Sequence, residues 1–181
     1  MRKELLSLIP EFQFIQDGEL QEKSIQIWLK AMEKRNWEIE NLQNMPFTLL
    51  LQNTSINIVQ HTRAVTLCSL KIAEVIEEKY QGKVSINKDY LLSGALLHDV
   101  GKLFEYKKEK GQFVKSEEGK LLRHPISGAA FAYKFGLPHE ILHIIAAHSK
   151  EGDGARKTVE AVIVNHADFV NFDTLNIEGK V

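Results

Sequence analysis

The spacing of hydrophobic residues follows a helical period over most of the chain. Asp17 is placed to cap a first helix over about 18–35, whose apolar positions fall on one stripe. A long second helix with a broad apolar face is predicted over about 54–80. Between these two helices, 41–51 is interpreted as an irregular connector, because Pro46 breaks the helical pattern.

The second half of the chain predicts several shorter elements. Asn87 can cap a third helix that runs to about His98, and the weak alternation over 104–115 predicts either a small hairpin or a loop. Three more helices are predicted, over about 125–135, 138–148 and 159–172. We therefore expect an all-α fold, a helical bundle in which 1–50 form an N-terminal flanking segment and 51–181 form the main domain.

Composition narrows the class of protein. The chain has 23 Lys and Arg against 24 Asp and Glu, so its net charge of -1 indicates no general attraction to nucleic acid or to an anionic membrane. Cys68 is the only cysteine, which excludes an internal disulfide and a cysteine-rich zinc site. The apolar stretch within 1–10 is too short for a signal peptide, and no apolar run is long enough to span a membrane. We expect a soluble cytoplasmic protein, and a homo-oligomer stays open.

Four histidines and two aspartates carry the candidate chemistry. They stand on successive predicted elements, and steps of 37, 26, 24 and 20 residues separate these elements. The six residues are His61, His98, Asp99, His124, His148 and Asp168. Each step is about one helix plus one turn, so every element can deliver its side chain to a common point in a bundle, where metal sites recur.

A single histidine on a helix is more often a surface or hydrogen-bonded core residue than a ligand. Helical phase argues against that interpretation here, because His61 shares a face with Val65, and His148 is in phase with Ile144. Imidazoles that point into apolar faces need polar partners, since burying an unsatisfied polar group is costly. A metal ion is one such partner.

The doublet His98-Asp99 is the sharpest local feature. It ends a helix rich in small and apolar residues, and Gly101 permits an abrupt turn after it. Neighbouring residues diverge by about 100° in helical phase, so the two side chains can serve different metals, or Asp99 can bridge two. With this doublet, the chain from His61 to Asp168 resembles the HD-domain metal-dependent phosphohydrolases, whose pattern is H…HD…H…H…D. Its segments look similar to the HD domains of ribonuclease Y-type and HD-GYP proteins.

The resemblance implies a phosphohydrolase with a two-metal site held by the six residues above. By the same resemblance, Asp99 would be catalytic, bridging two divalent transition-metal ions while a hydroxide attacks phosphorus. Imidazole and carboxylate ligands without thiolate favour Fe or Mn, and they also suit Co, Ni or Zn. Two divalent ions and two carboxylates leave a charge of about +2, which favours a small phosphorylated substrate such as a nucleotide or phosphodiester.

Two further basic residues are candidates for binding substrate. Lys102, three residues beyond Asp99, is expected at the mouth of the site as a catalytic phosphate contact, and Arg123 adjoins His124. The stretch 102–123 carries a local charge of +3, which either steers anions or forms a solvated charged loop. Helical phase or distance sets four other residues apart from the proposed ligands: His139, His143, His166 and Cys68.

Departures from the resembling families leave the subfamily open. The Gly-Tyr-Pro motif is absent, and Ser149 follows His148 where HD-GYP proteins have a second histidine. No KH-like segment is recognised before the domain, and the Glu-Asp signature of the (p)ppGpp hydrolases is missing. Two other functions remain open. One is a mixed-valence di-iron oxygenase, which uses a similar set of six ligands, and the other is a non-catalytic sensor that binds a nucleotide or metal.

Overall fold

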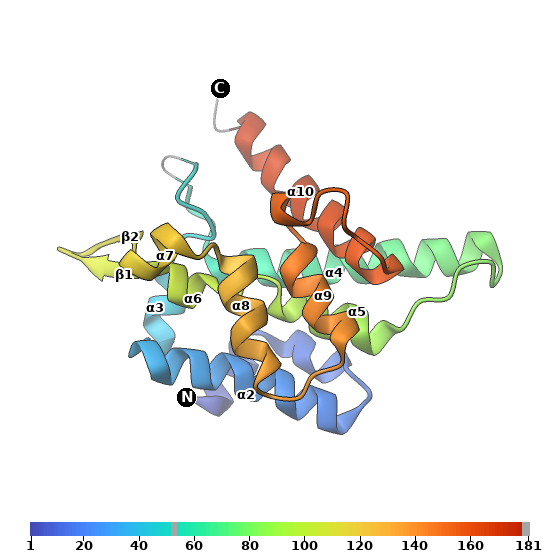
Figure 1. The fold of residues 1–181 in the computed structure, drawn as a ribbon, viewed down its shortest axis with the longest axis horizontal. Helices are drawn as coiled ribbons and strands as arrows, with labels where there is room; N and C mark the ends of the chain where they lie inside the picture. The colour runs from blue at the N-terminus through green and yellow to red at the C-terminus, as the bar shows by residue number, and fades with distance from the viewer. Residues whose placement is uncertain (52–53, 179–181) are drawn as a thin grey trace.

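The computed structural model describes residues 1–51 and 54–178, and within them the chain forms a bundle of helices with one small hairpin at its edge (Figure 1). In chain order the elements are α1 (Arg2–Leu8), the 3-10 helix η1 (Pro10–Phe14), α2 (Gly18–Arg35), α3 (Ile39–Asn44), α4 (Ile58–Tyr80), α5 (Lys88–Leu97), α6 (Lys102–Glu105), β1 (Tyr106–Glu109), β2 (Gln112–Lys115), α7 (Glu117–Leu121), α8 (His124–Tyr133), α9 (His139–Ala147), the 3-10 helix η2 (Lys150–Gly152) and α10 (Val159–Glu178). The predicted all-α class is confirmed.

Local caps define several helix ends, and two of these caps, Asp17 and Asn87, were predicted from the sequence. The Asp17 carboxylate accepts hydrogen bonds from the first backbone N–H groups of α2. The side chains of Asn87 and Thr158 accept from Tyr90 N and Ala161 N in the first turns of α5 and α10. After α8 the chain turns at Gly136, which has a φ of +63°.

Other parts of the helical pattern differ from the prediction. The segment 41–51 is not wholly irregular, because α3 enters it, and the Asn41 side chain accepts a hydrogen bond from Glu38 N at the start of this helix. The helix α4 begins at Ile58 rather than near 54, since Asn57 caps it. The helices α1 and η1 were not predicted from the sequence, because each is too short to show a helical period.

Of the two alternatives for 104–115, the structure has the hairpin. Its strands are antiparallel, and Tyr106 lies opposite Lys115 at the base of the ladder. Lys110 and Gly111 at the tip both have positive φ values, as two-residue hairpin turns require.

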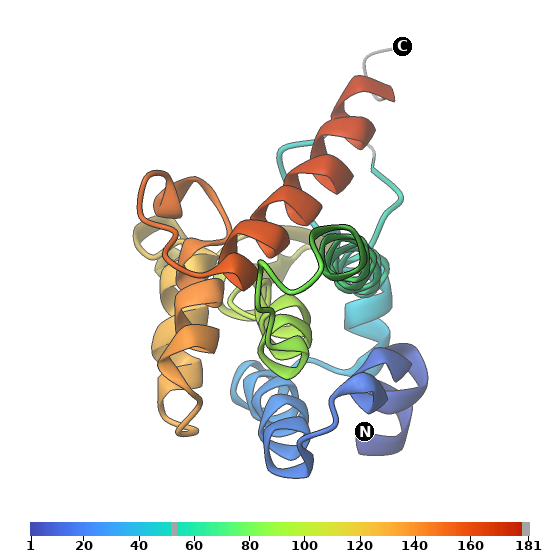
Figure 2. The same ribbon diagram turned by 90° about the vertical axis from the view of Figure 1, so that its right-hand side faces the viewer.

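The helix α5 lies in the middle of the bundle, with α2 on one side and α4, α9 and α10 around the other (Figure 2). The helix α9 packs closely on α5 at Gly94, where an added Cβ would lie 2.5 Å from Ile144 Cδ1. On the other side, Trp28 Nε1 of α2 donates to Leu96 O, and Trp37 Nε1 donates to Leu103 O. The first fifty residues thus hold the segment that contains the His98-Asp99 doublet. Within 1–51 and 54–178, no helix has the length and hydrophobicity needed to cross a membrane.

Candidate metal centre

The structure brings the six predicted ligands together from five parts of the fold. His61 lies in α4, the doublet His98-Asp99 follows α5, His124 opens α8, His148 caps the C-terminus of α9, and Asp168 lies in α10. The four imidazoles and the Asp99 carboxylate are buried, and Asp168 is partly exposed to the neighbouring pocket. Helix ends supply four of the six side chains, which explains why residues so far apart in sequence can meet.

Asp99 lies at the centre of the cluster. Its Oδ2 is 3.4 Å from the Nε2 atoms of both His61 and His98. Its Oδ1 is 3.4 Å from His124 Nε2 and 3.8 Å from His148 Nε2. Each carboxylate oxygen of Asp99 therefore faces a different pair of imidazoles.

Hydrogen bonds fix the orientation of three imidazoles. The Nδ1 atoms of His98 and His148 lie 2.6 Å from Ala95 O and 2.8 Å from Ile145 O, the carbonyls three residues earlier. His124 Nδ1 lies 2.8 Å from Glu105 Oε2. In each case Nδ1 must donate, so Nε2 carries the lone pair and points into the cluster, as in histidines that bind metals.

These lone pairs need a cation between them. His124 Nε2 and His148 Nε2 are 3.2 Å apart, and neither carries a hydrogen if both Nδ1 atoms donate. Ligand atoms about 2.1 Å from one metal ion lie roughly 3.0–3.4 Å from each other, so this separation suits a shared ion. The 3.4 Å between the Nε2 atoms of His61 and His98, and the 3.0 Å from His61 Nε2 to Asp168 Oδ1, suit one as well.

Two groups of three potential ligands result, and they share one residue. His61, His98 and Asp99 form the first group, and Asp99, His124 and His148 form the second. Imidazole nitrogens and carboxylate oxygens are the ligands that Fe, Mn, Co, Ni and Zn accept. The residues present therefore fit a centre for divalent metal ions.

The electrostatics of the cluster favour ionised carboxylates and neutral imidazoles at His61, His124 and His148, whose pKa values burial lowers. Burial acts to lower the pKa of His98 as well, but the charge of Asp99 raises it. Burial, together with the neighbouring His98 and His124, lowers the pKa of His148 to about 3. Burial acts to raise the pKa of Asp99, but the charges of Lys102 and His98 hold it well below its usual range. These are the protonation states in which both side chains bind a metal.

Lys102 is buried rather than placed at the mouth of the site. Its Nζ lies 2.6 Å from Asp99 Oδ2 and 5.6 Å from the centre of the Phe47 ring. The same Phe47 ring packs on the His61 imidazole, with ring centres 4.4 Å apart. Lys102 thus borders the cluster and one wall of the adjoining pocket.

Sequence reasoning missed the contribution of Glu105. This buried carboxylate accepts hydrogen bonds from both His124 N and His124 Nδ1, at 2.7 and 2.8 Å. Burial opposes its ionisation, yet the bonds from His124 lower the pKa of Glu105 to about 2. Its position in a highly charged stretch gave no signal, because such a residue is usually solvated. Asn165, also missed, donates through Nδ2 to His148 O at 2.6 Å.

The role of Gly101 differs from the prediction. Its φ is −63°, so the turn after the doublet does not require a glycine conformation. The requirement is space, because an added Cβ would lie 2.0 Å from His124 O and 2.8 Å from Gly128 N. Gly101 lets the start of α8 pack directly on the segment that carries Asp99, and this contact brings His124 to the cluster.

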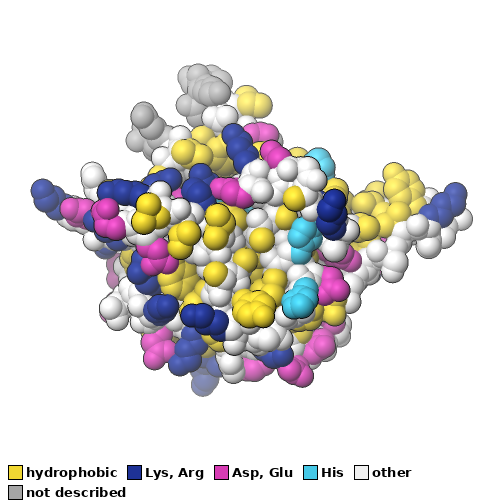
Figure 3. All heavy atoms as spheres, viewed as in Figure 1, with side chains coloured by type: hydrophobic (Ala, Val, Ile, Leu, Met, Phe, Trp, Pro, Cys, Tyr) yellow, Lys and Arg dark blue, Asp and Glu magenta, His cyan; other side chains and the backbone are white. Residues whose placement is uncertain are grey.

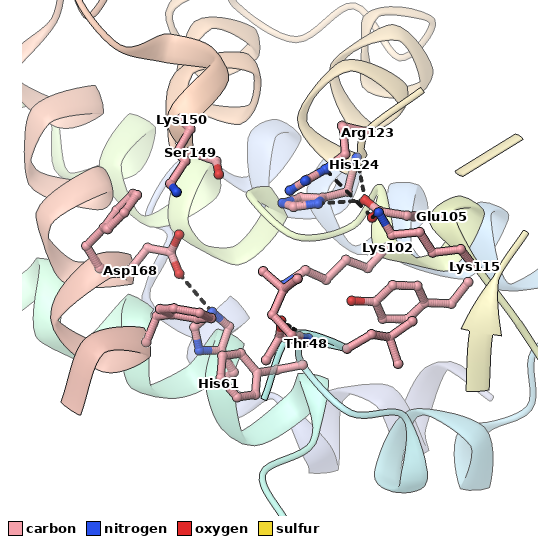
Figure 4. A pocket seen from close by; sticks show the side chains of 16 residues that line it. Thr48, His61, Lys102, Glu105, Lys115, Arg123, His124, Ser149, Lys150 and Asp168 are labelled. Atoms are coloured by element: carbon pink, nitrogen blue, oxygen red, sulfur yellow. Dashed lines mark hydrogen bonds and ion pairs between the residues drawn. The ribbon is translucent and has the colours of Figure 1, made fainter. Parts of the chain in front are cut away.

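A pocket of about 180 Å³ opens beside the cluster (Figure 4). His61, His124 and Asp168 reach it from the cluster. Aromatic and cationic side chains make up much of the remaining wall: Phe47, Tyr106, Phe169, Phe172, Lys102, Lys115, Arg123 and Lys150. This combination suits an anionic substrate with an apolar or aromatic part.

The histidines set apart by helical phase lie away from the cluster. His139 and His166 are exposed, and His143 Nε2 accepts a hydrogen bond from Lys157 N at 2.9 Å. Cys68 is half-buried.

Basic and acidic side chains alternate at the hairpin end of the molecule, whereas hydrophobic ones gather over α8 and α9 (Figure 3). Many of the cations there pair with neighbouring carboxylates, as Lys107 does with Glu109 and Lys120 with Glu117. The other cations of 102–123 therefore belong to a solvated charged surface, whereas Lys102, Lys115 and Arg123 line the pocket.

Comparison with known proteins agrees with this geometry. Residues 58–171, more than half of the chain, match the HD domain family. The chain belongs to the HD-domain family. The resemblance inferred from the order of the histidines and aspartates is thereby confirmed.

Relatives of known function match more than half of the chain. A dihydroneopterin 2',3'-cyclic phosphate phosphodiesterase from Methanocaldococcus jannaschii is 39% identical over 113 residues, 61% of this chain and 44% of the relative. Ribonuclease Y from Nitratidesulfovibrio vulgaris is 31% identical over 118 residues, 65% of this chain and 18% of the relative. The chain thus spans less than half the length of either relative. No solved structure shows a significant match.

Proposed function

We propose that this HD domain is a metal-dependent phosphohydrolase that cleaves a small phosphate ester, a nucleotide or a phosphodiester, at a two-metal centre. The observation that carries the proposal is the position of Asp99, whose two oxygens face different pairs of imidazole Nε2 atoms. One carboxylate between two pairs of nitrogen ligands is the arrangement that a bridged pair of cations needs.

When two divalent cations are bound, they supply the Lewis acidity that activates a water molecule and polarises a phosphoryl group. The side chains of the protein supply the electrostatic attraction and the contacts that position the substrate. Asp99 and Asp168 offset only part of the charge of such cations, so the cluster keeps a net positive charge that attracts an anionic oxygen substrate. His61 and His124 border both the cluster and the pocket, and a phosphate in the pocket therefore lies against the metal centre.

Lys102 is the residue that we propose to contact the phosphate. Its ammonium lies on Asp99 Oδ2 in the wall of the pocket, and it can turn one of its other N–H bonds towards a substrate oxygen. Arg123 is the second candidate, on the same wall. The aromatic rings of Phe169 and Phe172 offer apolar surface to the organic part of the substrate.

The names of the relatives support a phosphodiester. One relative is named as a phosphodiesterase for a cyclic phosphate, and others are named as a ribonuclease. Carried over to this chain, these names favour cleavage of a P–O bond.

The test is hydrolysis by protein that has been stripped of metal and then reloaded with Mn or Fe. We expect the reloaded protein to hydrolyse bis(p-nitrophenyl) phosphate and at least one nucleoside 2',3'-cyclic monophosphate, and a chelator to abolish both activities. Asp99→Asn should remain folded but inactive. A metal-loaded protein that leaves a panel of phosphate esters intact contradicts the proposal and favours a sensor. Oxygen uptake without phosphate release would favour the oxygenase.

A further inference from the structure

Lys115 and Arg123 converge on one carboxylate oxygen at the edge of the pocket. Lys115 Nζ lies 3.5 Å from Glu105 Oε1, and Arg123 Nε lies 3.7 Å from the same atom. Hydrogen bonds between oppositely charged groups are usually about 2.7–2.9 Å long. Both cations are thus near Glu105 without a close bond to it, and we call Lys115 and Arg123 the cationic pair.

One donor of the cationic pair is buried and unsatisfied. Arg123 Nε is buried and has no hydrogen-bond partner among the residues that the structure describes. The Glu151 carboxylate is also near, but its Oε1 is 3.6 Å away. An unmet buried donor costs free energy, so an anion that enters between these side chains is stabilised by bonds that the protein itself does not make.

The location of the pair defines what such an anion can be. Glu105 uses its other oxygen, Oε2, to hold His124 Nδ1 at 2.8 Å, and His124 Nε2 points into the metal centre. One carboxylate and one imidazole ring therefore separate the cationic pair from the metal centre, within the same pocket (Figure 4). Because these two groups stand between the two positions, the geometry favours phosphates joined through a sugar over phosphates joined by a single oxygen.

The base of the hairpin fixes the position of Lys115. Its cross-strand partner Tyr106 is buried and lines the same pocket, so the ladder holds the start of the lysine side chain against the wall. Lys108, by contrast, is exposed on β1 of the same hairpin and does not line the pocket. The hairpin thus offers a matched control with the same charge.

We propose that the cationic pair binds a second phosphate group of the substrate while the first lies at the metal centre. The substrate class is then a nucleotide with two phosphates on opposite sides of its sugar, as in a nucleoside 3',5'-bisphosphate or a short oligonucleotide. This inference rests on the proposed phosphohydrolase function. It adds a residue, Lys115, that neither the motif nor the metal centre identifies.

The experiment compares adenosine 3',5'-bisphosphate with AMP, which lacks the 3'-phosphate. Dissociation constants are measured by calorimetry on Mn-loaded protein, and the ratio of the two constants is the readout. We expect the wild-type protein to bind the bisphosphate at least about 10-fold more tightly, since one charged hydrogen bond contributes roughly 1.5–3 kcal/mol. Lys115→Ala should bring the ratio close to one, Lys115→Arg should retain most of it, and Lys108→Ala should leave it unchanged.

Two outcomes overturn the subsite while leaving the proposed function intact. Protein that hydrolyses bis(p-nitrophenyl) phosphate but binds both nucleotides equally has no second phosphate position. A Lys115→Ala protein that retains the preference, or a Lys108→Ala protein that loses it as well, shows that the cationic pair does not create it. Protein that neither hydrolyses a phosphodiester nor binds either nucleotide overturns the subsite and the proposed function together.

Discussion

The metal centre and the cationic pair border the same pocket, yet they are built in opposite ways. In the centre, His98 and His148 are fully buried, and their Nδ1 atoms lie 2.6 and 2.8 Å from backbone carbonyls. In the pair, the Lys115 and Arg123 side chains are 39% and 41% exposed, and their ionic contacts are 3.5 Å or longer. The centre is thus held in one geometry before any ligand arrives, whereas the pair is free to adapt to one.

This difference in rigidity suits the two regions to two different tasks. A fixed set of ligands suits metal binding and catalysis, because orienting the ligands costs nothing further when the ion arrives. Partly exposed cations at the edge suit recognition of a substrate. Glu105 links the two regions, since one of its oxygens holds His124 and the other faces the cationic pair.

Loss of a ligand in the centre should have the largest effect. His98→Ala and Asp99→Ala are each expected to abolish metal binding and to reduce phosphodiester hydrolysis to background, because Asp99 faces all four imidazoles. His143→Ala is the control, and it should stay close to wild type since His143 lies outside the cluster. Equal loss in all three variants would contradict this division of the histidines.

The second largest effect is expected from a change in the packing beneath the metal centre. Gly101→Ala forces a Cβ against His124 O and Gly128 N, so we expect a loss of about 1–3 kcal/mol or more in stability and reduced metal binding. Each kcal/mol should lower Tm by roughly 2–4 °C in a chain of this size. At Gly18 an added Cβ meets nothing within 4 Å, so Gly18→Ala should leave Tm nearly unchanged. Similar melting curves for both variants would show that α8 does not depend on this close approach.

Glu105→Gln tests the link between the two regions. We expect metal affinity to fall by about 10- to 100-fold, since outer carboxylates that orient a metal-binding histidine commonly have that effect. The control is Glu117→Gln, an exposed carboxylate near the hairpin that pairs with Lys120. Metal titrations followed by calorimetry distinguish the two variants, and unchanged affinity in Glu105→Gln would remove its role in positioning His124.

Lys102→Ala should have the smallest effect of the four. The variant should keep its metal ions but show a KM raised, or a kcat lowered, by about 2- to 10-fold, the value of one ordinary hydrogen bond, because Asp99 already offsets the charge of Lys102. Steady-state kinetics and metal content measured on the same preparation check this. Unchanged kinetics would remove Lys102 from phosphate binding, and loss of the metal would instead make it a support for Asp99.

The main helices and the convergence of the ligand candidates were predictable, because both depend on periodicity. Val65 and Ile144 show which faces of their helices point inward, and the structure buries both of them together with His61 and His148. Asp17 and Asn87 mark helix starts through local hydrogen bonds that need no knowledge of the rest of the fold.

Contacts between distant segments were not predictable. Glu105 is buried because α7 passes over it, and this is allowed only because Gly119 lacks a Cβ, which would lie 2.2 Å from Glu105 O. Lys102 was expected at the mouth of the site as a phosphate contact, yet it is buried and turns inward to Asp99. Neither residue has a local pattern that distinguishes it from the solvated charges around it.

The most direct test of the account is the number of metal ions per chain. Elemental analysis of protein reloaded with Mn or Fe should find about two ions per chain, and Asp99→Ala should lose both, because its carboxylate faces both pairs of histidines. Wild-type protein that takes up no metal, or an Asp99→Ala variant that keeps its full complement, would contradict the central claim.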